Sequence, residues 1–297
     1  MADKAESGTT RNQNRILPET RALSAFIAPF LVIAFLILFL RSHETERLFA
    51  WPIGPQMTAM MLGATYLTGV FFFTTVMFAR RWQQVKFGFI PVTAFASMMG
   101  VATVLHWDAF AHGHLAFWLW AGLYFTTPFL VFAVWLRNTR SARLSPPLPG
   151  QLTLPSPVRA AVGAVGLIGV LQSLLLFMLP NFMIDIWPWT LSELTARVVA
   201  AQFIVFSFYS VAAFLDPRWE SLRLATRSQL VAPVFFLVAV VASWDNFDTS
   251  NPLTWFFVFN VVVVFVIGVP AMYFFMERRR KSPGTSRPAD AASEARG

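Results

Sequence analysis

Eight apolar segments constrain the fold of this 297-residue chain more than any other feature. A helix of roughly 20 residues crosses a bilayer, because each residue adds about 1.5 Å along an axis that must span about 30 Å of hydrocarbon. The chain is therefore predicted to be an all-α integral membrane protein with about eight transmembrane helices, the first of them retained. The expected spans are residues 22–40, 55–79, 89–106, 115–136, 158–179, 196–215, 230–244 and 253–276.

Composition supports a lipid environment. Hydrophobic residues make up 56% of the chain and charged residues 13%, whereas soluble domains are about 45–50% apolar and about 25% charged. The net charge is +8, but the basic residues lie between the apolar segments and form no separate basic domain. We therefore expect the lipid bilayer as the partner and exclude nucleic acid.

The distribution of basic residues predicts the orientation. If the chain crosses the bilayer eight times, 20 of its 23 Lys and Arg residues fall on one side. Loops rich in Lys and Arg stay in the cytoplasm. The sequence thus predicts a multi-pass protein of the plasma membrane or bacterial inner membrane with both termini in the cytoplasm.

The two halves of the chain resemble each other. Trp51-Pro52 corresponds to Trp187-Pro188, and three further tryptophans recur 137 residues later, as Trp82 and Trp219, Trp107 and Trp244, Trp118 and Trp255. Tryptophan is rare, so a constant spacing indicates an internal duplication. Each half has four helices, an even number, so both enter the membrane in the same direction. The expected fold is a parallel 4+4 internal repeat, with its pseudo-twofold axis along the membrane normal.

This organisation divides the chain into five parts. Residues 1–20 are polar and are expected to be a disordered cytoplasmic N-terminus. Residues 21–137 and 158–280 are the two expected four-helix membrane repeats. Residues 138–157 are rich in proline, with Pro146, Pro147, Pro149 and Pro155 among them, and form the expected cytoplasmic linker. Residues 281–297 are rich in Ser, Pro and Ala and are expected to be a disordered cytoplasmic tail.

Tryptophans at the ends of the segments are typical of membrane interfaces, where the indole places one edge in the apolar layer and its N–H in the headgroup layer. Six tryptophans fit this role as interfacial anchors: Trp51, Trp82, Trp107, Trp187, Trp219 and Trp244.

Few polar side chains lie inside the apolar segments, and none at a segment centre is ionisable. The absence argues against a proton-coupled pump, which needs titratable groups at membrane depth. The strongest of these polar side chains are three amides, all in the second half: Gln172, Gln202 and Asn260. They are candidate substrate-binding residues between helices, and the alternative is that each hydrogen-bonds to a neighbouring helix and stabilises the bundle.

Three histidines and a carboxylate gather in one expected outer loop. His106, Asp108, His112 and His114 fall within nine residues, and the second half has no histidine at the matching positions. Neutral imidazole suits zinc, copper, iron or nickel, so the four are candidate metal ligands. The spacing matches no standard zinc pattern, and ordinary interfacial histidines are the alternative.

No catalytic or cofactor motif identifies the activity, and enzymatic activity stays uncertain. No cofactor is required by the sequence, and a divalent metal at the histidines is the one candidate. The chain has no cysteine, which excludes disulfides and thiolate metal sites. Three classes remain: a carrier for a neutral or amphipathic small molecule, a scaffold or accessory subunit with a membrane-protein partner or a homo-oligomer, and an outward-facing metal-binding membrane enzyme.

Overall fold

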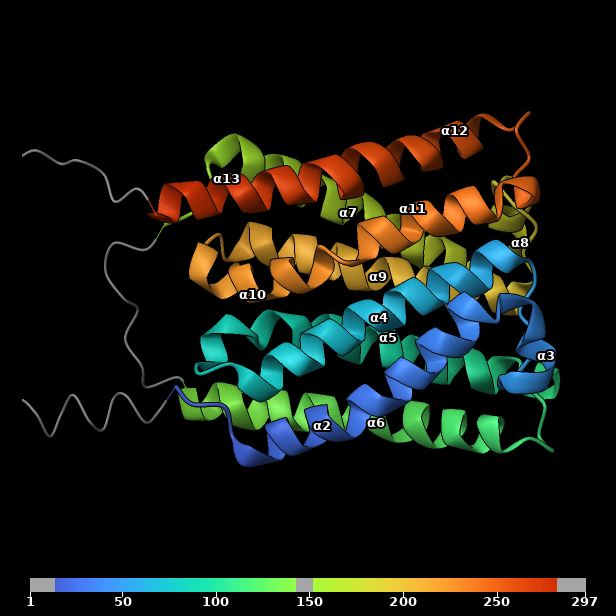
Figure 1. Cartoon of the computed structure of the whole chain (residues 1–297), viewed down its shortest axis with the longest axis horizontal. Coiled ribbons are helices and arrows are strands. Elements are labelled where there is room, and N and C mark those ends of the chain that lie inside the picture. Colours follow the sequence, from blue (N-terminus) through green and yellow to red (C-terminus); the bar gives the residue numbers. More distant parts are fainter. Residues whose placement is uncertain (1–13, 143–151, 282–297) are drawn as a thin grey trace, which may run out of the picture.

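A computed structural model describes residues 14–142 and 152–281 (Figure 1). These residues are helical and form no strand beyond two isolated bridges. Eight helices are long and apolar enough to cross a membrane, which agrees with the predicted all-α membrane architecture. Their bounds are Pro18–Leu40, Gln56–Phe78, Lys86–Leu105, Leu115–Ala142, Ser156–Met178, Glu193–Leu215, Trp219–Ala242 and Pro252–Lys281.

Three of the eight spans contain more than one helical element. The first comprises α2 (Pro18–Phe35) and a π-helix, η1 (Leu36–Leu40), and the last comprises α12 (Pro252–Phe259), a π-helix, η6 (Asn260–Gly268), and α13 (Val269–Lys281). The seventh comprises α10 (Trp219–Gln229) and α11 (Ala232–Ala242). The other spans are single helices, in chain order α4, α5, α6, α7 and α9.

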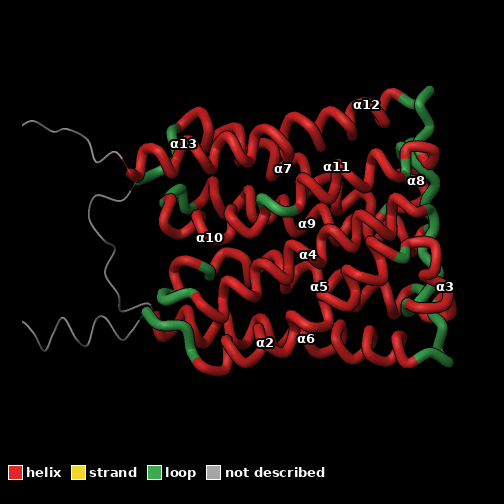
Figure 2. Tube along the Cα trace, in the orientation of Figure 1, coloured by secondary structure: helices red, strands yellow, loops and turns green. Residues whose placement is uncertain are grey.

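The seventh span departs most from the expected bounds. It begins at Trp219 rather than at residue 230, because α10 precedes the apolar part of the span and carries Glu220, Arg223 and Arg227. Leu230 and Val231 interrupt the helix, and Figure 2 shows this loop about halfway along the bundle. The first span likewise begins earlier than expected, at Pro18 rather than residue 22. Residues 1–13, 143–151 and 282–297 lie outside the described residues. They hold most of the two expected disordered termini and the middle of the expected linker, whose first residues belong to α6 and whose last residues belong to α7.

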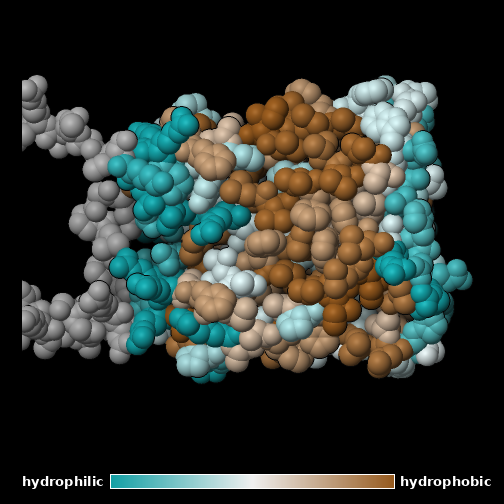
Figure 3. All heavy atoms as spheres, in the orientation of Figure 1, coloured by the Kyte–Doolittle hydropathy of each residue, from teal (hydrophilic) through white to brown (hydrophobic). Residues whose placement is uncertain are grey.

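The bundle has two polar ends and an apolar belt between them (Figure 3). We call one end the basic end; it holds Pro18, Phe78, Lys86, Trp219 and Lys281. The opposite end, which we call the histidine end, holds the short helices α3 (Thr45–Leu48) and α8 (Pro180–Ile184) and the loop around His112. A large exposed apolar belt is costly in water but stable in hydrocarbon, so this surface fits a multi-pass membrane protein.

Glycines let α7 pack closely on α9. A Cβ atom on Gly166 would lie 2.9 Å from Ser210 Cβ and from the backbone N of Val211, and one on Gly169 would lie 2.2 Å from Ser207 Oγ. Small residues at such contacts let membrane helices approach until their backbones touch, which is how helices associate without a hydrophobic driving force.

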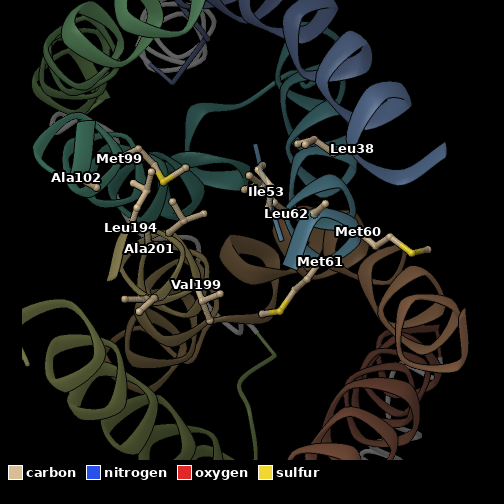
Figure 4. Close-up of a cluster of buried hydrophobic side chains, with 14 of the residues drawn as sticks. Leu38, Ile53, Met60, Met61, Leu62, Met99, Ala102, Leu194, Val199 and Ala201 are labelled. Atoms are coloured by element: carbon tan, nitrogen blue, oxygen red, sulfur yellow. The ribbon is translucent and has the colours of Figure 1, made fainter. Parts of the chain in front are cut away.

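The core lies where the two halves meet. Helix α5 of the first half packs against α9 of the second half, and α11 of the second half packs against α4 of the first half. In Figure 4, Met99 of α5 lies beside Leu194 and Ala201 of α9, and the Met61 side chain extends toward Val199. Flexible methionines fill such irregular contacts well.

Local structure recurs at the spacing of the tryptophans. Helix α9 (Glu193–Leu215) begins and ends 137 residues after α4 (Gln56–Phe78), and the 3₁₀ turn Trp107–Ala109 recurs as Trp244–Asn246. Hydrogen bonds follow the same spacing: Trp118 Nε1 donates to the His112 carbonyl at 3.0 Å, and Trp255 Nε1 donates to the Thr249 carbonyl at 3.1 Å.

Candidate functional site

The three candidate amides lie on different elements. Gln202 of α9 is buried, and its Oε1 accepts a 3.0 Å hydrogen bond from Thr65 of α4. Asn260 begins η6 and donates to the Phe256 carbonyl of its own helix at 2.8 Å. Gln172 is half-buried on α7. None of the three hydrogen-bonds to another in the described part of the chain, and none of them lines the cavity described below.

The four candidate metal ligands are not brought together at one point either. Asp108 and His114 are exposed, whereas the His112 ring packs against Phe117 with centroids 4.7 Å apart. Within residues 14–142 and 152–281, no three His, Asp or Glu side chains are placed to hold a metal ion. The histidine loop therefore supplies no metal-site geometry from which chemistry can be derived.

His106 pairs with the second half of the chain. Its Nε2 lies 2.6 Å from Arg197 Nη1, and Arg197 also contacts Glu193 Oε2 at 3.2 Å. Burial lowers the pKa of His106, and the positive charge of Arg197 lowers it further. The imidazole is therefore neutral near pH 7 and accepts the hydrogen bond from the guanidinium. This contact ties α5 to α9 at the histidine end.

Four of the six expected anchors are buried between helices. Trp51, Trp82, Trp187 and Trp219 are at most 7% exposed, whereas Trp107 and Trp244 are half-exposed. Two of the buried indoles have partners: Trp82 Nε1 donates to Thr139 at 3.3 Å, and Trp219 Nε1 donates to Glu277 at 2.9 Å. These four tryptophans pack inside the bundle, and only the half-exposed pair is placed like an interfacial residue.

A different group of residues encloses a cavity of about 110 Å³ halfway along the bundle. Helices α2, α4, α5 and α6 of the first half surround it, and α9 and α10 close it from the second half. Its lining is mainly apolar. A cavity of about 150 Å³ lined by apolar side chains stays dry and binds benzene, so this space suits a small molecule or an apolar group of that size.

Two tyrosines supply the polar group of this cavity. Tyr66 lies halfway along α4, and its hydroxyl hydrogen-bonds to that of Tyr124 of α6 at 2.7 Å. Phe95 of α5 meets both rings edge to face, with centroids 6.1 Å and 6.0 Å away. All three side chains are buried, so the hydroxyl pair is held by packing on three helices.

The hydroxyl pair has a hydrogen atom to spare. Two phenols carry two hydroxyl hydrogens, and the bond between them uses one. Among the residues that the structure describes, neither Tyr66 nor Tyr124 has another hydrogen-bond partner. Tyr209 also lines the cavity, but its hydroxyl hydrogen is already used, because it donates to the Leu222 carbonyl at 3.0 Å. An unpaired buried donor costs about 1–3 kcal/mol, and a ligand acceptor placed there would recover that free energy.

Aromatic side chains close the cavity along the bundle axis. Toward the histidine end, Tyr124 packs on Trp120 with centroids 4.2 Å apart, and Trp120 packs on Trp51 at 4.7 Å. Toward the basic end, the cavity-lining Phe72 packs on Phe89 at 5.5 Å. All five rings are buried, and they lie between the cavity and the two ends of the bundle.

The interruption of the seventh span meets this cavity. Ser228 and Gln229, the last residues of α10, are part of its lining. Non-helical backbone at membrane depth is tolerated where it is buried in protein or lines a cavity, because its polar groups need partners. First-half helix α5 runs unbroken through the matching region, so the break belongs to one half only.

The sequence reasoning missed the tyrosines, although a signal was present. The chain has four tyrosines against 32 phenylalanines, and three of the four line the cavity: Tyr66, Tyr124 and Tyr209. A scarce hydroxylated ring inside an apolar segment is a stronger marker of a polar site than an amide, because tyrosine brings a donor while keeping an apolar body.

Comparisons with protein-family models, with curated proteins and with solved structures find no match for this chain.

Proposed function

We propose that this protein binds a neutral, largely apolar small molecule between its helices and carries it. The observation that supports this most strongly is the spare hydroxyl hydrogen of the Tyr66–Tyr124 pair inside an apolar cavity. Ligand sites in proteins are mostly apolar, with a few placed polar groups that fix orientation. A molecule with one hydrogen-bond acceptor and an apolar body of about benzene size matches this lining.

The broken seventh span supports a carrier over a static binding protein. Transporters often build substrate sites from discontinuous helices near the middle of the membrane, where a helix can move as two segments. Here α10 reaches the cavity with Ser228 and Gln229, and Tyr209 binds α10 to α9 through the Leu222 carbonyl. A shift of α10 would therefore change the cavity wall while α11 keeps its contact with α4.

We also infer that the chain is a parallel repeat of two four-helix units, residues 21–137 and 158–280. The recurrence of helix bounds at a spacing of 137 residues supports this, as does the reciprocal packing of α5 on α9 and α11 on α4. Thr65 and Gln202, which hydrogen-bond to each other, are themselves 137 residues apart. Matching residues touch in this way where a twofold axis passes between them.

For orientation we propose that the basic end faces the cytoplasm of a plasma membrane or bacterial inner membrane. The cysteine-free chain allows a direct test with single-cysteine variants. In intact cells, a membrane-impermeant maleimide should label Asp248→Cys and should not label Arg81→Cys, both of which are exposed positions. Arg81→Cys should become reactive after permeabilisation, and its labelling in intact cells would show that the orientation is reversed.

A scaffold or accessory subunit is the second candidate. One observation favours it: only 6% of the most apolar window of the last span is buried inside the chain. A helix with so few contacts in its own bundle is free to pack on another membrane protein or on a second copy. This reading needs no ligand, so ligand binding at the tyrosine pair separates the two candidates.

The carrier proposal is tested with two ligands of the same shape. Acetophenone carries a carbonyl oxygen where α-methylstyrene carries a methylene group, so only acetophenone accepts a hydrogen bond. At matched concentrations in the membrane, acetophenone should raise the unfolding temperature of the purified protein more than α-methylstyrene does, because ligands that bind only the native state stabilise it. Equal shifts, or none, would contradict the proposed site.

A further inference from the structure

The side of the cavity between α2 and α6 is held by polar contacts at one end only. Around it α2 packs on α4, α6 packs on α5, and α10 packs on both α4 and α5. Helices α2 and α6 meet at the basic end, where Asn138 hydrogen-bonds to Thr20 and to the backbone N of Leu17 and Arg137 pairs with Glu19. Beyond Thr20, no hydrogen bond, ion pair or ring contact joins α2 to α6 in the described chain. Figure 1 shows α2 turning away from α6 toward the histidine end.

The lining residues nearest this side are half-exposed. Leu31 lies on α2 and Leu123 and Thr127 lie on α6, whereas Tyr66 and Tyr124 behind them are buried. We call Leu31, Leu123 and Thr127 the rim. At the rim, between α2 and α6, the cavity therefore comes close to the outside of the bundle.

The surface around the rim is apolar. Phe26 of α2 is 57% exposed and Leu130 of α6 is 47% exposed, and neither segment carries a charged side chain at this depth. Exposed apolar side chains at the middle of a transmembrane helix face hydrocarbon. A molecule that reaches the rim from outside thus comes from the interior of the bilayer.

We propose that the ligand enters from the hydrocarbon layer between α2 and α6, and that it is a lipid-dissolved neutral molecule with one hydrogen-bond acceptor. This rests on the proposed function and specifies its substrate class and source. A charged or strongly hydrated solute does not reach such an entrance, because transferring it into hydrocarbon is costly. The acceptor then meets the hydroxyl pair, and the apolar body stays between Phe95 and the rim.

A rim plug tests the route. Thr127→Phe places a ring at the entrance. Gly122→Phe places the same ring on the exposed face of α6 that points away from the lining, where a Cβ atom meets no atom within 4 Å. Association and dissociation of acetophenone are followed in proteoliposomes by stopped-flow tryptophan quenching. Both rate constants should fall roughly tenfold in Thr127→Phe and stay at the wild-type value in Gly122→Phe, because an obstructed entrance slows passage both ways.

The outcomes separate the route from the site. Saturable binding with unchanged rates, or a change confined to dissociation, would place the entrance elsewhere and overturn the lateral route while leaving the binding site intact. A wild-type protein that shows no saturable binding overturns the proposed function itself.

A second measurement is independent of how well the plugged variant folds. A spin label on Leu123→Cys should be relaxed more by oxygen, which concentrates in hydrocarbon, than by a water-soluble nickel chelate. A label on Glu46→Cys, an exposed position on α3 at the histidine end, should show the opposite order. Stronger relaxation of the Leu123→Cys label by the nickel chelate would show that the rim opens to water and would overturn the lateral route.

Discussion

Replacing Gly100 with leucine is expected to destabilise the protein by about 3 kcal/mol, the upper range for an overpacked core. A Cβ atom on Gly100 of α5 would lie 2.9 Å from the Tyr124 carbonyl oxygen of α6. The obstructing atom is backbone, so the clash cannot be relieved by a side-chain rotation. The two helices must separate, and Tyr124 would then move away from Tyr66. Thermal unfolding in detergent, together with acetophenone binding, measures both effects.

Gly122 provides the matched control for this substitution. It lies on α6, and a Cβ atom there would meet no atom within 4 Å. Gly122→Leu should keep or slightly raise the unfolding temperature, because leucine favours helix over glycine by roughly 0.5–1 kcal/mol. A Gly100→Leu variant as stable as Gly122→Leu would contradict the close packing of α5 on α6.

Acetophenone binding should survive the loss of either tyrosine hydroxyl but should be weakened by the loss of both. In Tyr66→Phe the remaining hydroxyl of Tyr124 still has a free hydrogen, and in Tyr124→Phe the same holds for Tyr66. Each single variant should therefore bind acetophenone within a few-fold of wild type. The double variant has no donor, and burying the ligand carbonyl without a partner costs about 1–3 kcal/mol, so its affinity should fall roughly tenfold or more.

Two controls accompany this series. α-Methylstyrene should bind the double variant at least as well as it binds wild type, because it needs no donor. Tyr209→Phe removes a hydroxyl that is already paired with the Leu222 carbonyl, so it should lower stability by about 1 kcal/mol and leave the preference between the two ligands unchanged. If only one of the two single variants lost acetophenone binding, the spare hydrogen would belong to one tyrosine and would not be shared by the pair.

The sequence predicted the number of spans because apolar length is a direct consequence of the thickness of the bilayer. It placed the start of the seventh span too late. Arg223 and Arg227 lower the hydropathy of α10 and resemble loop residues, but the Trp219 and Arg223 side chains bind Glu277 of α13 at the basic end. Pairing between spans distant in sequence cannot be read from the local hydropathy of one segment.

The candidate site was harder to predict than the spans, because it also depends on contacts between segments that are distant in sequence. Tyr66 is a polar feature of one half only, because Phe203 stands 137 residues later. Gln172, Gln202 and Asn260 were chosen as candidates because their amides are polar groups inside apolar segments. Whether a polar residue lines a cavity or hydrogen-bonds inside a helix contact depends on which helices pack together, and hydrophobic periodicity does not determine that.

Equilibrium titration of the wild-type protein with acetophenone and α-methylstyrene, each corrected for its partition into the membrane, shows directly whether the tyrosine pair holds a ligand. We expect one saturable acetophenone site per chain, with an affinity about tenfold higher than that for α-methylstyrene, because the tyrosine pair donates to the carbonyl. Equal affinities would contradict the role of the hydroxyl pair, and the absence of saturable binding by either ligand would contradict the carrier function.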